Sequence, residues 1–443
     1  MGFRDLILTV GLVGSIPACF FRPWIGILVW SLVSYMNPHR LTYGFAYDFP
    51  FAQLIAIATL SGFVLSGDRK RFLWTREIVL VVALGIWFTI TTVFAVYPES
   101  AWAKWSEVSK ILLMALLVVP LFQDRGRLRR LLVVIGFSLG FYGVKAGVFA
   151  LATGGRWMVL GPPGSFFEAN NEMALVLNMT LPILFALARE EEHFWRRRLL
   201  WMAFGLTAVA VPFTYSRAGV LGLVVVLAFL FLKARRRLLL LPILVVAVVG
   251  FVRFAPEAWT ERMQTLENVE ADESAQLRFM SWRVGYRIAS DRPVVGGGFK
   301  VFVHRETYDI YLPEYPRPFG HDAHSIYFNL LGEHGWIGLG LYVVLIGSCF
   351  ATLRRLRKLA ASEPRFAWMS NYTLMLQACL ATYLVNGAFI SAAYFDLAFQ
   401  LIILVGLLNG LSREPAVAAE PAPLAEPARV TLPVTRSVRL RTP

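Results

Sequence analysis

The chain has 443 residues, of which 57% are hydrophobic and 16% are charged, and its formal net charge is +14. The mean hydropathy is +0.58. This composition excludes an ordinary soluble globular protein and predicts a single large membrane domain. The basic residues stand in short clusters between apolar runs, so membrane lipids are expected partners and nucleic acid is not. The three cysteines, Cys19, Cys349 and Cys379, all lie in apolar runs and indicate neither a disulfide framework nor a metal site.

Apolar runs long enough to cross a bilayer as helices recur along the whole chain. In chain order they cover residues 3–36, 49–66, 77–96, 101–122, 128–152, 170–189, 198–213, 217–232, 237–254, 324–352, 370–386 and 389–411. The first run is broken at Arg22-Pro23, so the total is about twelve crossings if it spans once and about thirteen if it spans twice. The predicted fold class is therefore an all-α polytopic membrane protein.

The basic clusters orient this arrangement. They lie at residues 68–71, 124–130, 196–198, 233–237 and 354–358, and the positive-inside rule assigns all of them to the cytoplasm. The long stretch 255–323 then forms one large periplasmic loop. We divide the chain into N-terminal transmembrane helices (1–254), the periplasmic loop domain (255–323), C-terminal transmembrane helices (324–411), and a Pro/Ala-rich cytoplasmic tail (412–443) that we expect to be disordered.

Two histidines precede an apolar run in the segment GHDAHSIYFNLLGEHGWIGLG, residues 320–340. If a helix begins near Ser325, His324 lies at its N-terminus, where the helix dipole keeps the imidazole neutral and able to act as a general base. His321 would shape the approach to it. A metal pair formed by His321 and His324 lacks a third ligand, so no metal site is expected.

Several cations are candidates for binding an anion. Arg217 follows Ser216 at the expected start of a helix, a position that suits phosphate. Arg278 and Arg287 belong to a segment of basic and aromatic residues at helical spacing, which is also typical of a helix lying on the membrane. Lys145 is a charge inside a predicted span and is for that reason a candidate functional residue; a side chain that reaches to the membrane surface is the alternative.

The pattern of His324 and Ser325, nine residues, Gly335, two residues and Gly338 resembles the His-[Asn/Ser/Gln]-x9-Gly-x-x-Gly motif of bacterial O-antigen ligases. The segments SRAG (216–219), DRPVVGGGFKVF (291–302) and GSFFEANNEMALVL (164–177) are similar to further segments of the O-antigen ligase and polymerase superfamily, so the resemblance covers roughly residues 150–352. It implies a multi-pass protein of the bacterial inner membrane with its active site on the periplasmic face. It also implies transfer of a glycan from undecaprenyl pyrophosphate to a sugar hydroxyl of the lipid A core, without a cofactor.

Within this resemblance, the chemistry assigns His324 to the acceptor proton and Arg217 and Arg278 to the pyrophosphate, with inversion at the anomeric carbon and no metal. An O-antigen polymerase and an exosortase-associated or protein O-glycosylation ligase remain open alternatives, because they differ only in the acceptor. A transporter of lipid-linked glycans is the alternative from another class. It predicts paired broken helices and a site near the bilayer midplane, whereas the candidate residues gather at one face.

Overall fold

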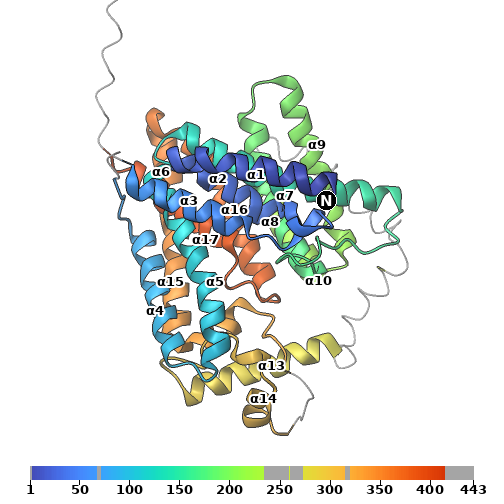
Figure 1. Cartoon of the computed structure of the whole chain (residues 1–443), viewed down its shortest axis with the longest axis vertical. Coiled ribbons are helices and arrows are strands. Elements are labelled where there is room, and N and C mark those ends of the chain that lie inside the picture. The colour runs from blue at the N-terminus through green and yellow to red at the C-terminus, as the bar shows by residue number, and fades with distance from the viewer. Residues whose placement is uncertain (1, 67–70, 234–258, 260–272, 315–319, 415–443) are drawn as a thin grey trace, which may run out of the picture.

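The computed structural model describes residues 2–66, 71–233, 259, 273–314 and 320–414, and in these ranges the chain is helical without a strand. The fold is thus all-α, as expected (Figure 1). The helices are α1 (Phe3–Phe21), α2 (Pro23–Met36), α3 (Phe51–Leu65), α4 (Arg76–Val93), α5 (Pro98–Leu116), α6 (Val118–Leu121), α7 (Arg125–Ala152), α8 (Asn170–Glu190), α9 (Phe194–Ala210), α10 (Arg217–Lys233), α13 (Glu273–Asp291), α14 (Arg305–Tyr311), α15 (Ile326–Ser362), α16 (Met369–Gly387) and α17 (Asp396–Leu411). Short 3₁₀ turns are η1 (Pro38–Leu41), η2 (Phe45–Tyr47), η3 (Pro212–Thr214), η5 (Val301–Val303) and η6 (Pro364–Phe366).

Five of the described helices, α1, α4, α7, α8 and α15, are long and apolar enough to cross a membrane, and α2, α3, α10 and α17 are shorter apolar helices. The protein is accordingly an integral membrane protein built from several apolar helices. The number of crossings stays a prediction, and the run expected at 237–254 lies outside the described residues. Of the predicted loop domain, α13 and α14 are described, and of the predicted tail, residues up to 414.

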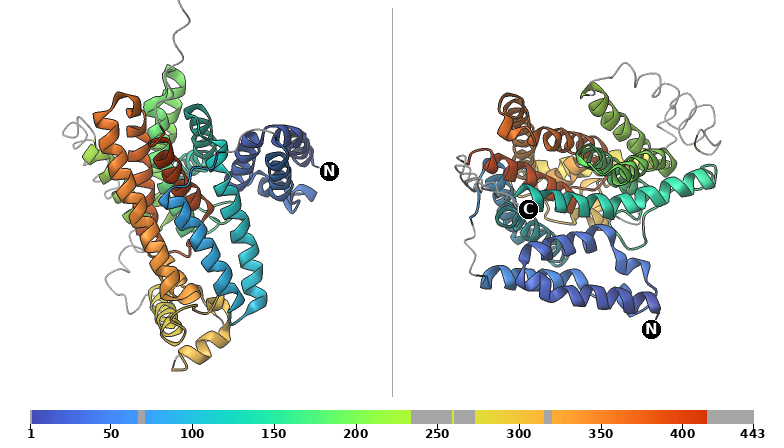
Figure 2. Two further views of the ribbon diagram at one scale, coloured as in Figure 1. Left: turned by 90° about the vertical axis from the view of Figure 1, so that its left-hand side faces the viewer. Right: turned by 90° about the horizontal axis from the view of Figure 1, so that it is seen from above.

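The first apolar run forms two helices. A break at Arg22 separates α1 from α2, and Pro23 opens α2 at the position where a helix best tolerates proline. The backbone N–H of Ala46 donates to Asp5 at 3.2 Å, so the start of α1 lies beside the segment that follows α2. The two helices are therefore antiparallel, and together with α3 they form a group that projects from the rest of the molecule (Figure 2).

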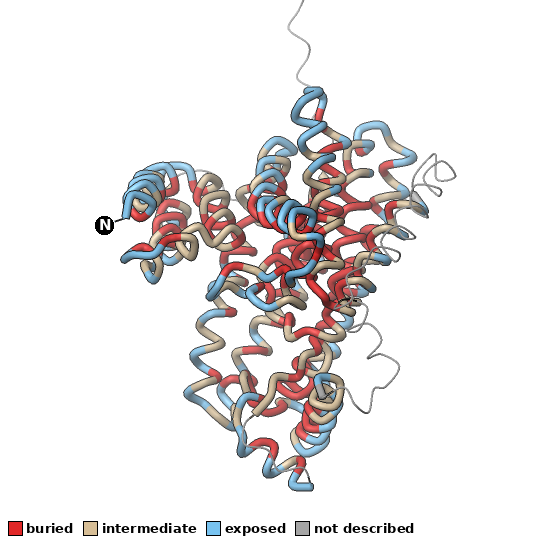
Figure 3. The backbone as a smooth tube through the Cα atoms, turned by 90° about the vertical axis from the view of Figure 1, so that its right-hand side faces the viewer, coloured by how far each residue is buried: buried red, intermediate tan, exposed pale blue. Residues whose placement is uncertain are grey.

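The most buried helices are α8, α16 and α17, which lie at the centre of the body (Figures 1 and 3). In α17 every residue from Leu397 to Gly410 is buried, as expected of a helix that is apolar on all sides. The opposite case is α1, where Phe3 is 76% and Phe21 is 77% exposed. Such exposed apolar side chains suit a helix surrounded by lipid.

Contacts between helix ends define two faces of the molecule. On one face two of the basic clusters meet at Glu191, which pairs with Arg129 at 2.7 Å and with Arg196 at 3.1 Å, and Arg125 lies 5.9 Å from the centre of the Trp368 ring. We call this the basic face. At the opposite end of α15 and α4, where α13 and α14 lie (Figure 1), the Val96 N–H donates to the Gly297 carbonyl at 2.9 Å. We call this second face, which carries His324 and the start of α15, the outer face.

Candidate functional site

A cavity of 360 Å³ opens among the outer-face ends of α2, α5, α15 and α17, beside the loop at residues 164–167. We call it the central cavity. Its lining is unusually polar for a membrane protein and holds four carboxylates and two amines: Glu107, Asp322, Glu333, Asp396, Lys104 and Lys300. Buried charge is costly in a membrane protein and is kept mainly where a site needs it. The central cavity is therefore the first candidate for the functional site.

Glu333 anchors the wall of the central cavity from within α15. Its side chain is only 2% exposed, and it accepts hydrogen bonds from the Lys300 backbone N–H at 2.7 Å and from the Tyr394 hydroxyl. The same hydroxyl contacts His334 Nε2 at 2.7 Å, while Nδ1 of that ring contacts the Thr91 hydroxyl at 2.6 Å. One buried network thus joins α4, α15 and the segment before α17, which fixes the cavity wall as a unit.

The backbone conformation at position 335 of the motif requires glycine. Gly335 has φ +67 and interrupts α15, and a Cβ on it would lie 2.4 Å from the Val294 carbonyl oxygen. Next to this break, Gly297 and Gly298 donate their N–H groups to the carbonyls of Gly332 and Glu333 at 2.8 Å. The triple glycine at 296–298 therefore lets one backbone lie directly against another, and it places Lys300 beside the central cavity.

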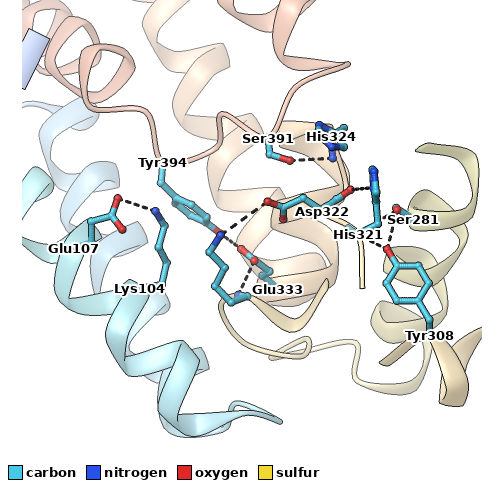
Figure 4. A network of polar contacts seen from close by, with 11 residues as sticks. Lys104, Glu107, Ser281, Tyr308, His321, Asp322, His324, Glu333, Ser391 and Tyr394 are labelled. Atoms are coloured by element: carbon cyan, nitrogen blue, oxygen red, sulfur yellow. Dashed lines mark hydrogen bonds and ion pairs between the residues drawn. The ribbon is translucent and has the colours of Figure 1, made fainter. Parts of the chain in front are cut away.

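The segment from His321 to Ser325 is held from three sides before α15 begins at Ile326. The His321 carbonyl accepts from Ser281 of α13 at 3.3 Å and from the Tyr308 hydroxyl of α14. His324, with φ 45, donates its backbone N–H to the Ser391 hydroxyl at 2.9 Å. Ser391 itself lines the central cavity, so the His324 backbone is one hydrogen bond away from that cavity (Figure 4).

Asp322 and the two histidines face different surroundings. Asp322 lines the central cavity, with its carboxylate 3.9 Å from the Lys300 amine. The His321 and His324 rings lie 4.8 Å apart, and Figure 4 shows His321 on the side of Ser281. Burial, the nearby His321 and the cation of Arg278 lower the pKa of His324 to about 4, against the opposing pull of Asp322. At neutral pH the His324 imidazole is uncharged and able to accept a proton.

Of the arginines predicted to bind the anion, Arg278 is the one whose charge affects the pKa of His324. It lies in α13 and is half-buried, and both it and Asp322 act on the carboxyl of Glu172 near the start of α8. The aromatic edge of α13 packs inward as well, since the Trp282 ring stacks on Phe328 at 5.0 Å. That edge of α13 thus contacts α15, whereas the sequence suggested a helix lying against the membrane.

Arg217 is the first residue of α10, at the helix start that the sequence predicted. Ser216 caps this helix, because its hydroxyl accepts the N–H of Gly219 at 3.0 Å and donates to Asn171 at 2.7 Å. Asn170 also donates to the Thr214 carbonyl at 3.0 Å. The starts of α8 and α10 are therefore fastened together, which puts the Arg217 end of α10 beside the helix start that carries Glu172.

Two other candidates lie elsewhere. Arg287 bonds the Tyr311 carbonyl at 2.6 Å and Glu314 at 2.8 Å, on the side of α14 and outside the central cavity. Lys145 lines a second cavity, between α7 and the N-terminal helices. Among the residues that the structure describes, no three His, Cys, Asp or Glu side chains are grouped to hold a metal ion.

Sequence reasoning did not predict that the charged residues lining the central cavity come together. Lys104 and Tyr394 belong to no motif, and Lys300 lies in the family-like segment 291–302 without being singled out there. The three residues meet because α5, the 296–304 segment and the segment before α17 converge. Glu333 did leave a signal, because a carboxylate inside an apolar span is a candidate functional residue by default.

Two family models match the chain. Residues 202–343 match a family described as O-Antigen ligase, and residues 3–190 match a family of unknown function (DUF5935). No curated protein matches the chain. The first match contains Arg217, Arg278, the His324 segment and both motif glycines, while the second contains the whole N-terminal group and Lys145.

Proposed function

We propose that this chain, which carries a domain of the O-antigen ligase family over residues 202–343, transfers a glycan from undecaprenyl pyrophosphate to a sugar hydroxyl of the lipid A core. The carrying observation is the uncharged His324 beside Arg278, held by Ser391 at the edge of the polar central cavity. The reaction would take place at the outer face, which we assign to the periplasm of the bacterial inner membrane.

The chemistry needs one proton acceptor and one anion site. The acceptor oxygen attacks the anomeric carbon of the donor sugar and gives its proton to His324, while the bond from that carbon to the pyrophosphate oxygen breaks. The electron pair leaves on undecaprenyl pyrophosphate, whose growing charge Arg217 and Arg278 stabilise. Attack opposite to the leaving group inverts the anomeric centre. Arginines supply the positive charge, so the step requires no metal.

The low pKa of His324 fits a base whose proton affinity increases when the donor binds. Burial, the nearby His321 and the cation of Arg278 hold the imidazole neutral. A bound pyrophosphate brings two negative charges, which neutralise Arg278 and favour the imidazolium, so the pKa rises as the donor binds. His324 then becomes a stronger base only when a donor is in place.

The central cavity suits the acceptor sugar. Sugar hydroxyls are hydrogen-bond donors, and carboxylates are acceptors only, so Asp322 and Glu107 can hold a saccharide where an anion would be repelled. Asp322 is two residues from His324, which brings a sugar held there close to the proposed base.

The test is reconstitution of the full chain in liposomes with an undecaprenyl-pyrophosphate glycan and rough lipopolysaccharide. We expect a product in which the glycan is attached to the lipid A core. Transfer only to a second lipid-linked glycan would make the protein a polymerase, and transfer only to a protein would make it a protein glycosylation ligase. Movement of the donor across the bilayer without any glycosidic product would contradict an enzyme and favour the transporter.

A further inference from the structure

A second and larger cavity, of 1250 Å³, lies between the N-terminal helices and α7. Its walls are the start of α1, residues 40–48, the second half of α7 and the loop at 158–163. We call it the outer groove. All of its lining residues precede residues 202–343, the part of the chain that matches the O-antigen ligase family.

The outer groove carries positive charge where little is expected. Its lining holds three cations, Arg4, Arg40 and Lys145, and a single carboxylate, Asp48. The positive-inside rule depletes Lys and Arg from the non-cytoplasmic side of a membrane protein, and this groove lies on the face opposite the basic clusters. Lys145 is moreover about 10 Å from the end of α7, from the rise of a helix, so it sits within a membrane helix.

These cations are poorly neutralised by the protein. Arg40 approaches Asp48 at 3.3 Å, but that carboxylate is 85% exposed, and the Arg40 guanidinium also lies 4.5 Å from the centre of the Tyr47 ring. Arg40 Nε is buried without a hydrogen-bond partner. Within the described part of the chain, neither Arg4 nor Lys145 forms an ion pair. The groove therefore offers three cationic groups to an anion from outside.

The remainder of the wall is apolar and continuous with lipid-facing surface. Along one side of α7 it holds Phe141, Lys145, Val148 and Phe149, at the spacing of a single helix face. Val148 is 52% and Phe149 is 42% exposed, as are large apolar side chains along α1. An anion with hydrocarbon chains, rather than a free anion, matches such a site.

The outer groove and the central cavity share their dividing wall. Residues 158–163 line the groove and 164–167 line the cavity, while Arg40 lines the groove and His39 lines the cavity. Gly164, with φ +71, turns the chain at this wall, and a Cβ on it would lie 3.3 Å from the Arg40 guanidinium carbon. A molecule whose phosphate rests in the groove therefore has the central cavity next to its head group.

We propose that the outer groove binds the phosphate of the lipid that carries the acceptor sugar, with Arg4, Arg40 and Lys145 on the phosphate and the acyl chains along α7. This assignment rests on the proposed function, because the lipid is an acceptor only in the proposed transfer reaction. It gives the two lipid substrates separate anchors: the donor pyrophosphate at Arg217 and Arg278, and the acceptor lipid at the groove, with its sugar reaching into the central cavity.

The test measures lipid binding separately from transfer. The full chain is placed in nanodiscs made of lipids without net charge. Binding of radiolabelled lipid A is then compared with binding of the same lipid after enzymatic removal of its phosphates. The variant is Arg4→Gln with Lys145→Gln, since both side chains are exposed and their removal leaves the core intact. The matched control is Arg156→Gln, an exposed cation of the same outer-face loop that does not line the groove.

We expect the double variant to bind lipid A roughly 10- to 100-fold more weakly, because it loses two charge-assisted contacts. The control should bind as the wild type does, and the dephosphorylated lipid should bind wild type and variant equally weakly. Equal binding of lipid A by the double variant and the wild type would overturn the proposal. Displacement of lipid A by phosphatidylglycerol at equal concentration would overturn the acceptor assignment.

Transfer assays then separate the two proposals. If the groove anchors the acceptor, the double variant should raise the KM for the acceptor by a similar factor and leave donor affinity unchanged. A different result is that lipid A binds through its phosphates to a wild-type protein that transfers no glycan, and that the double variant abolishes this binding. That result would support the lipid site in the outer groove and contradict the proposed transferase activity.

Discussion

The central cavity and the outer groove lie on the two sides of one wall, residues 158–167, yet they carry opposite charge. The cavity holds four carboxylates and two amines, and the groove holds three cations and one carboxylate. A carboxylate-rich surface accepts hydrogen bonds from sugar hydroxyls and repels phosphate, and a cationic surface does the reverse. Neighbouring sites of opposite charge can therefore orient a lipid-linked sugar by its two ends.

The two sites also differ in how the protein holds their charges. In the cavity, Glu333 is fixed by the Lys300 backbone and by Tyr394. In the groove, Arg4 and Lys145 are exposed side chains on helix surfaces. A prearranged network is suited to positioning groups for chemistry, whereas flexible cations are suited to capturing a mobile anion.

The largest effect is expected at His324. Replacing it with alanine should lower the rate of transfer by about 10²- to 10⁴-fold, the usual contribution of a general base. Donor affinity should stay nearly unchanged because Arg217 and Arg278 remain. Turnover and donor binding are measured on the same preparation, with His321→Ala as the matched control, which should be milder. Normal turnover, or a loss explained by donor binding alone, would remove His324 from the role of base.

Arg217→Lys should have the next largest effect. Lysine keeps the charge but loses the two-pronged contact with phosphate oxygens. We expect transfer to fall roughly 10- to 100-fold, in line with one or two lost hydrogen bonds to a charged group. The thermal unfolding midpoint should not change, since Ser216 still caps α10. A variant that transfers glycan at the wild-type rate would show that Arg217 only marks the membrane surface.

Glu333→Gln should lower transfer by roughly tenfold, since glutamine keeps the shape but weakens two hydrogen bonds made by the carboxylate. The loss should appear in kcat more than in donor affinity, because Lys300 and Tyr394 shape the cavity rather than the arginine site. Glu363→Gln, near the other end of α15, serves as the control. A change in protein yield without a change in kcat would make Glu333 a folding residue only.

The pH profile offers a signature that a purely structural histidine would not give. With a pKa near 4 in the free protein, His324 is neutral from pH 8 to pH 5. Its titration should therefore cause no change in kcat/KM over that range. Below that pKa the imidazolium cannot accept a proton, and kcat/KM should fall about tenfold per pH unit. The acid limb of kcat should lie at higher pH, because bound pyrophosphate raises the pKa. Coincident limbs would contradict a base tuned by its donor.

The sequence was sufficient for the features that depend on local pattern. Apolar runs predicted the helices, Ser216 and Arg217 marked the start of α10, and the spacing from His324 to Gly335 and Gly338 resembled a motif of the O-antigen ligase family, whose model matches residues 202–343. The sequence could not predict that Tyr394 and Lys300 contact Glu333, because these residues lie 61 and 33 positions from Glu333 along the chain. Such meetings depend on how helices pack, and a single sequence has no local signal for them.

The smallest effect is expected at Arg287, and it tests how α13 is used. Arg278 and Arg287 are nine residues apart, which places them on opposite sides of a helix with 3.6 residues per turn. Arg287 is held by Glu314, whose carboxylate raises the pKa of the guanidinium, and exposed pairs of this kind contribute little to stability. Arg287→Ala should therefore change transfer by less than about threefold, whereas Arg278→Ala should lower it at least about tenfold, through the loss of a contact with pyrophosphate. Both rates are measured together with extraction of the protein from the membrane. Equal losses in the two variants, accompanied by easier extraction, would mean that both arginines anchor α13 to head groups and that Arg278 has no part in holding the donor.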